Sequence, residues 1–373
     1  MKIIKILFLT ILFTVFAKEI SNYIFQSKVE SRVYNTGFYY LSQKPLSSSH
    51  NFDSLFTPYH IYLLNYRPSP ENFVRYFENI RYLSYGIFFL SLYLKQGLII
   101  SILLSFILVI SPLSLIQKTW ISFPDTYTFL FSLFLVIQKL YSSKEIQKDS
   151  KELLQNSYIL KDIYKSLKIK FKINSYSYFF FFIIISLGLF NHFYQFFFIA
   201  FEIICINFYF LRDKYQFILD LLFLLLSAIF IRSISQYLFI LNNIEIVDYR
   251  LSIVKSLSYE ELIKINFTNL FTGIYGFLFG LWLIFLYDVL IKKNYSHIFS
   301  FIFSFCITFF TYDTTRIFTL IFFVSFLFSL TLNLRNYTSR DIKALSVLTF
   351  LSSIVYFFQP LYYKWGERII YLK

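Results

Sequence analysis

The residues with the most reactive side chains in this sequence lie at short polar sites that interrupt long apolar runs. Four such sites are residues 123–126 (Phe-Pro-Asp-Thr), residues 191–195 (Asn-His-Phe-Tyr-Gln), Arg232 and residues 312–316 (Tyr-Asp-Thr-Thr-Arg). An ionisable side chain inside an apolar membrane segment is costly, so it is a candidate for function by default. Each of these sites is therefore a candidate position for binding or catalysis.

Asp313 and Arg316 are three residues apart, so on a helix they share a face. The carboxylate can then hold the guanidinium, whose planar shape suits a phosphate group. A structural interpretation competes with this one: Asp313 caps a helix start, and Arg316 extends toward the lipid headgroups. The sequence leaves both interpretations open. We take phosphate binding as the working prediction, with Asp313 and Arg316 as substrate-binding residues.

The other polar sites also allow a structural and a chemical interpretation. Ser122 and Asp125 have the spacing of a capping box at a helix start, while Asp125 is also a candidate catalytic carboxylate. His192 is either a histidine at a surface turn or a substrate-binding group. Arg232 is predicted to end a helix at the same level and to bind substrate. Glu202 falls near the middle of an apolar run, where a carboxylate must be protonated, paired or exposed to a polar cavity.

The segment 25–80 holds further ionisable residues, among them Glu30, Asp53 and His60. An ionised carboxylate above a membrane surface can remove a proton from an acceptor hydroxyl, so Glu30 and Asp53 join Asp125 as candidate catalytic bases. His50, Asp53 and His60 are residue types that bind divalent metals. Their spacing is not that of a tight ligand set, and no metal or other cofactor is predicted.

The elements that must position these side chains follow from composition. The chain has 373 residues, of which 57% are hydrophobic and 15% charged, well below the charged fraction of soluble domains. The two cysteines, Cys205 and Cys306, lie in apolar runs without the spacing of a disulfide framework or zinc site. Lys and Arg punctuate the apolar runs, so the net charge of +14 indicates a membrane partner and no nucleic acid.

The sequence predicts an all-α polytopic membrane protein, a single integral membrane domain over residues 1–373 with about 11 transmembrane helices and two long outer loops. The apolar stretch 176–211 would be roughly 54 Å long as one helix, so the chain must turn within it, at Gly188 to His192. The predicted spans are residues 3–24, 81–95, 98–115, 122–141, 176–190, 193–211, 216–232, 269–291, 298–312, 314–334 and 344–361.

The distribution of basic residues predicts the orientation. The basic loop 142–175 carries eight Lys against four acidic residues and is predicted to be cytoplasmic, with the N-terminus on the same side. The outer loops 25–80 and 233–268 sum to zero charge, although the C-terminal tail places two positive charges outside. The first helix also resembles a secretory signal ending near Ala17, so its cleavage stays open.

This layout resembles the GT-C class of membrane glycosyltransferases and related polysaccharide polymerases. The features that carry the resemblance are the long first outer loop with Glu30 and Asp53, and the polar sites at 123–125, 191–195 and 313–316. The chain lacks the paired acidic residues of that class directly after the first helix and has no soluble C-terminal domain. The resemblance implies transfer of a sugar from a polyprenyl-phosphate lipid to a glycan acceptor at the outer face, with Arg316 and Arg232 stabilising the leaving phosphate.

Two other functions remain open on the sequence alone. A proton-coupled transporter or lipid-linked-glycan flippase would use Glu202, although no internal repeat is visible. A non-enzymatic envelope assembly subunit would make every polar site a structural cap. With glycosyl transfer preferred, the expected location is a bacterial inner membrane, and the expected partners are a polyprenyl-phosphate lipid, a glycan acceptor and membrane lipids.

Overall fold

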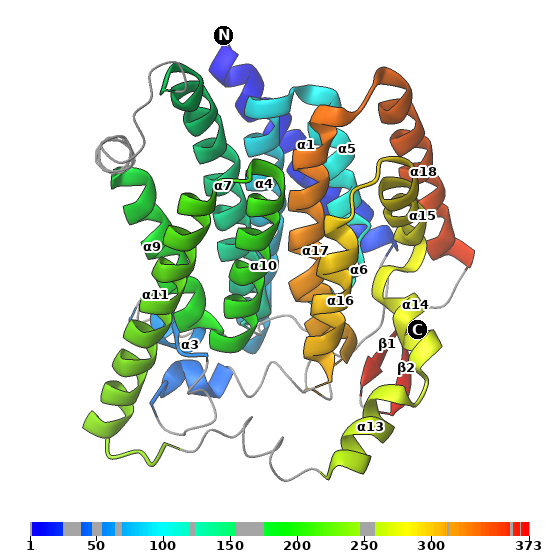
Figure 1. Ribbon diagram of the computed structural model, residues 1–373. Helices are drawn as coiled ribbons and strands as arrows, with labels where there is room; N and C mark the ends of the chain where they lie inside the picture. The colour runs from blue at the N-terminus through cyan, green and yellow to red at the C-terminus, as the bar shows by residue number, and fades with distance from the viewer. Residues whose placement is uncertain are drawn as a thin grey trace.

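The computed structural model of the chain describes residues 2–24, 39–46, 54–63, 69–119, 124–153, 175–246, 258–309, 311, 314–358, 361–365 and 367–372. These residues form a bundle of helices and one two-stranded antiparallel sheet (Figure 1). The predicted all-α class is confirmed for the bundle. The small sheet at the C-terminal end was not predicted.

The first half of the described chain is built from helices alone. Their bounds are α1 (Lys2–Ile24), α3 (Phe56–Leu63), α4 (Pro70–Gln96), α5 (Leu98–Val109), α6 (Pro112–Thr119), α7 (Asp125–Leu153) and α9 (Ser175–Asn191).

The second half adds several short or irregular helical segments and the sheet. It contains α10 (Phe193–Leu211), α11 (Lys214–Leu241), α13 (Tyr259–Phe267), α14 (Leu270–Leu278), η2 (Phe279–Leu281), α15 (Trp282–Leu286), η3 (Tyr287–Ile291), α16 (Ser296–Thr308), α17 (Thr314–Asn333), η4 (Leu334–Asn336), α18 (Ser339–Phe358), β1 (Leu361–Trp365) and β2 (Arg368–Leu372).

Four described helical stretches are long and apolar enough to cross a membrane, namely α10, α11, Leu270–Ile291 and Thr314–Asn336. Helices α5 and α6, bent by 49° at their junction, make a fifth if they form one span. The molecule is thus a helical protein with several membrane-length helices. The predicted count of about 11 spans is not confirmed by length and composition.

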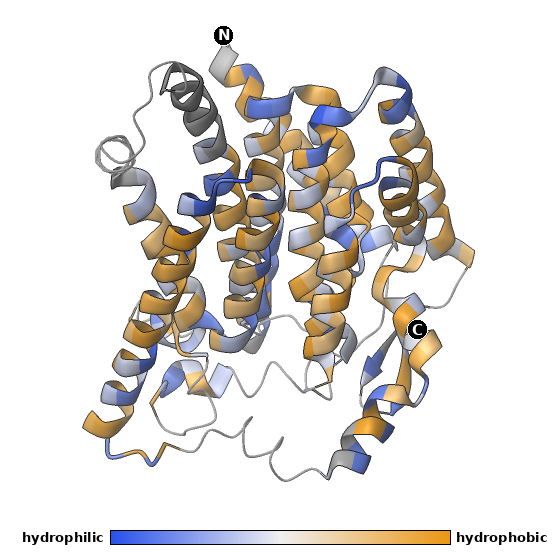
Figure 2. Ribbon diagram, in the orientation of Figure 1, coloured by the Kyte–Doolittle hydropathy of each residue, from blue (hydrophilic) through white to orange (hydrophobic). Residues whose placement is uncertain are grey.

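Helix α17 forms the centre of the bundle and α11 lies at its edge. In the most apolar stretch of each helix, 94% of the residues are buried for α17 and 22% for α11. Apolar side chains such as Ile229 and Phe230 on α11 are consequently exposed, as expected for a face that contacts lipid. Figure 2 shows mostly hydrophobic helices with hydrophilic residues gathered toward their ends.

The turn between α9 and α10 confirms the predicted break in the 176–211 stretch. Helix α9 ends at Asn191, and α10 begins at Phe193. A Cβ atom added to Gly188 would lie 2.3 Å from Cζ of Phe196, a distance that real contacts do not reach. Gly188 therefore allows the aromatic ring of α10 to pack directly on the α9 backbone, which closes this hairpin.

A second close approach joins the irregular stretch 279–281 to α18. A Cβ atom on Gly280 would lie 2.3 Å from the Ser352 carbonyl oxygen, and the Ser352 hydroxyl donates to the Gly280 carbonyl at 2.8 Å. Phe279 has a left-handed backbone with φ of 46°. A neighbouring hydroxyl thus satisfies a carbonyl at the helix break, as membrane helices require.

Several element boundaries differ from those predicted. Helix α4 begins at Pro70, before the predicted span at 81, because the Ser69 hydroxyl caps its first turn by accepting from Asn72 N at 3.3 Å. Helix α11 continues past the predicted end at Arg232 to Leu241. The segments 25–80 and 233–268, which were predicted as outer loops, therefore contain helices α3 and α13 and parts of α4 and α11.

The C-terminal hairpin of β1 and β2 packs on α14 and α17. Tyr362 and Lys364 of β1 contact the positions where Gly276 and Gly273 leave room, since an added Cβ atom would lie 2.7 Å from each side chain. The Lys364 ammonium donates to the Ile265 carbonyl near the end of α13 at 2.6 Å. Burial lowers the pKa of Lys364 to about 8. The segment after the last predicted span therefore forms an anchored hairpin.

Candidate functional site

Asp125 and Arg316 form an ion pair between the first turns of α7 and α17. The Arg316 Nε and Nη2 atoms both donate to the Asp125 carboxylate, with Nη2 3.1 Å from Oδ1. The side chains of Arg316 and Asp125 are 9% and 0% exposed, respectively. A two-bond pairing of this kind fixes the plane of the guanidinium. The structure therefore brings together two residues that are 191 positions apart and for which the sequence predicts separate roles.

Asn191, the last residue of α9, ties three elements together beside this pair. Its amide nitrogen donates to the Pro124 carbonyl at 2.7 Å and to the Thr128 hydroxyl at 2.9 Å. Its amide oxygen accepts from the Thr57 hydroxyl of α3 at 2.6 Å. These bonds hold the start of α7, and with it Asp125, against the α9–α10 turn and α3.

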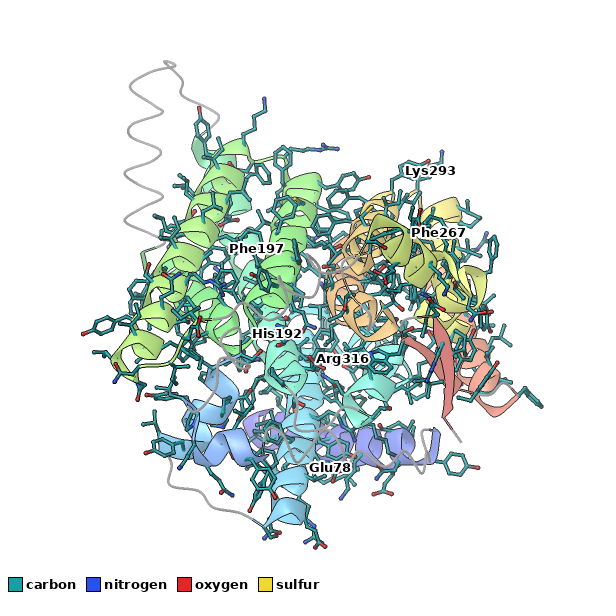
Figure 3. All side chains as sticks on the ribbon, turned by 90° about the horizontal axis from the view of Figure 1, so that it is seen from below. Glu78, His192, Phe197, Phe267, Lys293 and Arg316 are labelled. Atoms are coloured by element: carbon teal, nitrogen blue, oxygen red, sulfur yellow. The ribbon has the colours of Figure 1, made fainter. Side chains whose placement is uncertain are left out.

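His192 and Gln195 lie at the start of α10, and both are buried. Figure 3, which views the bundle from below, labels His192 and Arg316 close together near its centre. The amide atoms of Gln195 and the Thr126 hydroxyl on α7 have no hydrogen-bond partner in the described parts of the chain. Buried polar atoms of this kind call for a partner, so the first turns of α7 and α10 offer hydrogen-bonding groups to a ligand.

Arg232 lies inside α11, so the prediction that it ends a helix is wrong. Its guanidinium stacks 5.3 Å from the ring centre of Phe193 and 5.9 Å from that of Tyr194. Arg232 therefore lies next to the 191–195 turn, which agrees with the prediction that the two sites are at the same level of the bundle. The two aromatic rings stabilise its positive charge.

His60 of α3 forms a hydrogen-bonded cluster with two tyrosines. Its Nε2 atom is 3.1 Å from the Tyr76 hydroxyl and 2.8 Å from the Tyr127 hydroxyl, and the two hydroxyls are 2.7 Å apart. Its Nδ1 atom is 3.1 Å from the Phe56 carbonyl, which favours the tautomer with the proton on Nδ1. Burial lowers the pKa of His60, while hydrogen bonds to the Phe56 and Thr57 backbone oppose that shift.

Three predicted site residues, Glu30, Asp53 and Asp313, lie outside the described residues. Arg316 pairs with Asp125, and its predicted pairing with Asp313 falls outside the described residues. Within the same ranges, no group of three or more His, Cys, Asp or Glu side chains is placed to hold a metal ion. The Asp125 carboxylate accepts hydrogen bonds from the Arg316 guanidinium. This favours a role in positioning Arg316 over the role of a catalytic base.

Buried charges deeper in the bundle have partners that sequence reasoning misses. Asp220 pairs with Lys139 at 2.7 Å, and the Lys139 ammonium lies 3.8 Å from the ring centre of Phe181. Glu202 accepts from the Ser304 hydroxyl at 2.8 Å. Lys139 lies near the end of a predicted span, where the side chain of a basic residue usually extends toward the membrane surface. The sequence therefore gives no signal that distinguishes the buried Lys139 from a lysine at the surface.

Asp288 is buried and is hydrogen-bonded to residues other than its sequence neighbours Lys292 and Lys293. It accepts from His297 and Asn294 of the following segment at 2.6 and 2.7 Å, and from Asn333 at 2.9 Å. Lys292 instead pairs with Asp341 at 2.8 Å. The cluster around Asp288 joins the ends of η3, α16 and α17 and is far from the Asp125–Arg316 pair along α17.

Comparisons of the chain with models of protein families, with curated proteins and with solved structures found no match.

Proposed function

We propose that this protein is a membrane glycosyltransferase or polysaccharide polymerase that uses a polyprenyl-phosphate-linked sugar at the outer face of a membrane. The observation that supports it most is the buried, two-bond pair of Arg316 and Asp125 at the ends of α7 and α17. A guanidinium held in one plane at the start of α17 suits recognition of a phosphate oxygen. A snorkelling arginine would need no such partner.

In the proposed reaction, the oxygen of an acceptor hydroxyl forms a bond to the anomeric carbon of the lipid-linked sugar. The bond from that carbon to the phosphate oxygen breaks, and the electron pair leaves with the polyprenyl phosphate. Arg316 stabilises the negative charge that the phosphate gains. Asp125 fixes the orientation of Arg316, and His192, together with Arg232 and Asp313, contributes to binding the substrate.

The hydroxyl proton passes to a carboxylate, for which we propose Asp53 or Glu30 in the first outer loop. Asp125 is the third candidate base from the sequence. Its pairing with Arg316 supports the positioning role instead, because a carboxylate stabilised by a guanidinium is a weaker proton acceptor.

The proposed reaction needs the site to face the outside of the membrane. We propose eleven crossings with the N-terminus in the cytoplasm. The α4–α5 turn and the α17–α18 connection lie at the upper end of Figure 1 with the N-terminus, while α3, α13 and the hairpin lie at the lower end. Basic residues such as Lys95, Arg335 and Arg340 belong to the upper connections, which supports a cytoplasmic upper side and a bacterial inner membrane as the location.

The proposal is tested with the full chain in proteoliposomes supplied with radiolabelled polyprenyl-phosphate and polyprenyl-diphosphate sugars and with glycan acceptors. We expect protein-dependent sugar transfer and release of the polyprenyl phosphate. Arg316→Lys keeps the charge but loses the planar fork, so transfer should fall by at least about tenfold. Arg335→Lys, an exposed arginine at the other end of the same helical stretch, is the matched control. Equal transfer by both variants would return Arg316 to a structural role.

A proton-coupled carrier is the second candidate, favoured by the fully buried Glu202 with its Ser304 partner. A carrier of this type needs Glu202 to gain and lose a proton, so Glu202→Gln would abolish its function. The glycosyltransferase proposal expects Glu202→Gln to keep transfer and to lower protein yield, because Gln can still accept from Ser304. If Glu202→Gln loses function at normal protein yield while Asp53→Asn and Asp125→Asn stay active, the carrier is favoured.

A further inference from the structure

Arg81 of α4 is a fully buried arginine, with 0% of its surface exposed. Its Nη2 atom donates to the Tyr82 hydroxyl at 2.6 Å, and its guanidinium lies 4.6 Å from the ring centre of that tyrosine. Its Nε and Nη1 atoms have no hydrogen-bond partner among the residues that the structure describes. A neutral hydroxyl and an aromatic face are thus the contacts of this charge.

A buried cation without an anion is costly, because a charge loses its hydration on burial. Two other buried cations of the bundle illustrate the difference. Arg316 pairs with Asp125, and Lys139 pairs with Asp220. Arg81 forms no ion pair in the described part of the chain. A bound anion would supply the charge that the protein itself does not supply.

A second cation approaches Arg81 from α6. Lys118 interacts electrostatically with Arg81 and with Glu78. The half-buried Glu78, one turn before Arg81 on α4, forms no ion pair with it among the described residues. Two like charges brought together destabilise the empty protein. An anion between them would relieve that repulsion and stabilise both.

Polar groups of α1 and α6 surround the same region of α4. The Tyr85 hydroxyl is 2.6 Å from the Ser114 hydroxyl and donates to the Gln117 side-chain oxygen at 3.4 Å. The amide nitrogen of Gln117 is buried and has no partner in the described ranges. The Tyr82 hydroxyl donates to Asn22 of α1 at 3.1 Å. An unused donor therefore accompanies the two cations.

This cluster is distinct from the Asp125–Arg316 site. Figure 3 labels Glu78 toward the edge of the bundle, and it labels His192 and Arg316 near the centre. The cluster is built by α1, α4 and α6, while the other site is built by α7, α9, α10 and α17. A ligand at one position does not occupy the other.

We infer that Arg81 and Lys118 form a binding site for a phosphate group between α1, α4 and α6. The guanidinium offers two free donors in a fixed plane, a geometry that matches the oxygens of a phosphate. Lys118 adds a second positive charge, and Gln117 adds an amide donor. The phosphate is either free inorganic phosphate or the phosphate at the end of a lipid. This site stands independently of the proposed glycosyl transfer.

The site is tested by native mass spectrometry of the full chain, delipidated in a phosphate-free maltoside detergent. The probes are inorganic phosphate, farnesyl phosphate as a short lipid phosphate, and farnesol as its neutral counterpart. We expect Arg81→Gln to bind one phosphate-bearing molecule fewer per chain than the wild type, and Lys118→Gln to bind it at least about tenfold more weakly. Arg75→Gln, an exposed arginine on the same helix, should bind as the wild type does.

The probes distinguish the two sources of phosphate. If Arg81→Gln loses binding of both inorganic phosphate and farnesyl phosphate, the site accepts phosphate groups in general. If the variant loses binding of farnesyl phosphate alone, the site is specific for a lipid phosphate. Farnesol binding should be the same in all variants. Equal numbers of bound phosphate-bearing molecules in wild type and Arg81→Gln would overturn the inference, as would an equal loss of farnesol.

A stability measurement separates ligand binding from a structural role. Removing an uncompensated buried charge should leave the melting temperature of the ligand-free protein unchanged or higher. Arg81→Gln is therefore expected to fold and to lose stabilisation by farnesyl phosphate alone. A marked fall in melting temperature without ligand, or failure to fold, would assign Arg81 to the structure of α4 and overturn the site.

Discussion

At the residue scale, the chemistry of this chain depends on which buried charges are paired. Arg316 is paired with Asp125, Lys139 with Asp220, and Arg81 with no described carboxylate. Residue type and local spacing identify Asp125 and Arg316 as candidates. They do not predict that the two meet, because 191 positions separate them and only the packing of α7 against α17 joins them.

Exchange of the charges of Asp125 and Arg316 separates the structural and chemical roles of the pair. Asp125→Asn or Arg316→Gln leaves one buried charge unpaired and should destabilise the protein by about 3–5 kcal/mol. The double variant Asp125→Arg/Arg316→Asp should recover part of the melting temperature but no sugar transfer. The control is the same exchange at the exposed pair of Lys264 and Glu367, where little change is expected. Recovery of both stability and transfer would reduce the pair to a structural element.

His60 predicts a pH dependence of stability. Burial lowers its pKa in the folded protein below that of the unfolded chain, so the unfolded chain binds the proton first as the pH falls. The stability linked to neutral His60 is complete above about pH 6.5 and is lost at lower pH. His60→Gln should therefore show a smaller fall in melting temperature between about pH 7.5 and about pH 5.5 than the wild type. An identical fall would show that His60 does not contribute.

At the element scale, length and glycine placement predict the fold best. The stretch 176–211 is too long for one crossing, and the structure breaks it at Asn191 to Phe193 as expected. The C-terminal hairpin was missed although residues 361–372 hold two runs rich in Tyr, Trp and Ile around Gly366 and Glu367, a composition typical of a β-hairpin. Strand β1 is also held by contacts with α14 and α17. Helices α3 and α13 were missed because short helices in loops depend on caps and tertiary contacts, which apolar segment length does not detect.

Gly188→Ala tests the close approach that shapes the α9–α10 turn. The added methyl group would overlap the Phe196 ring, so we expect a loss of about 1–3 kcal/mol in the free energy of unfolding. Adding Phe196→Leu should recover part of that loss in a double-mutant cycle, because the smaller side chain can move away. If the effects of the two substitutions on the free energy of unfolding are additive, the methyl group added at Gly188 does not contact Phe196.

At the scale of the whole molecule, the alternation of helices places connections at two opposite ends of the bundle (Figure 1). The bias of Lys and Arg toward one set of connections predicts which end faces the cytoplasm. Helix length and composition do not confirm the predicted count of about 11 crossings, because charged residues within helices such as α4 and α7 reduce their apparent hydropathy. Arg81 and Lys139 are among these residues, and only the packed bundle reveals that they are buried.

Cysteine accessibility tests the orientation. In a background without Cys205 and Cys306, an impermeant thiol reagent applied to intact cells should label Glu245→Cys, an exposed site after α11, and spare Arg340→Cys, an exposed site at the start of α18. Leu160→Cys in the basic loop 142–175 should also be spared. Both protected positions should react after the membrane is permeabilised. Labelling of Leu160→Cys or Arg340→Cys in intact cells would reverse the proposed topology.

The proposed function depends on Arg316, held by Asp125, binding a lipid-linked phosphate where α7 and α17 begin. The most direct measurement is an electron cryomicroscopy structure of the full chain in nanodiscs saturated with polyprenyl phosphate. We expect phosphate density within hydrogen-bonding distance of the Arg316 guanidinium, with the Asp125 pair retained. Phosphate density elsewhere in the bundle, with Arg316 enclosed by protein side chains alone, would contradict it.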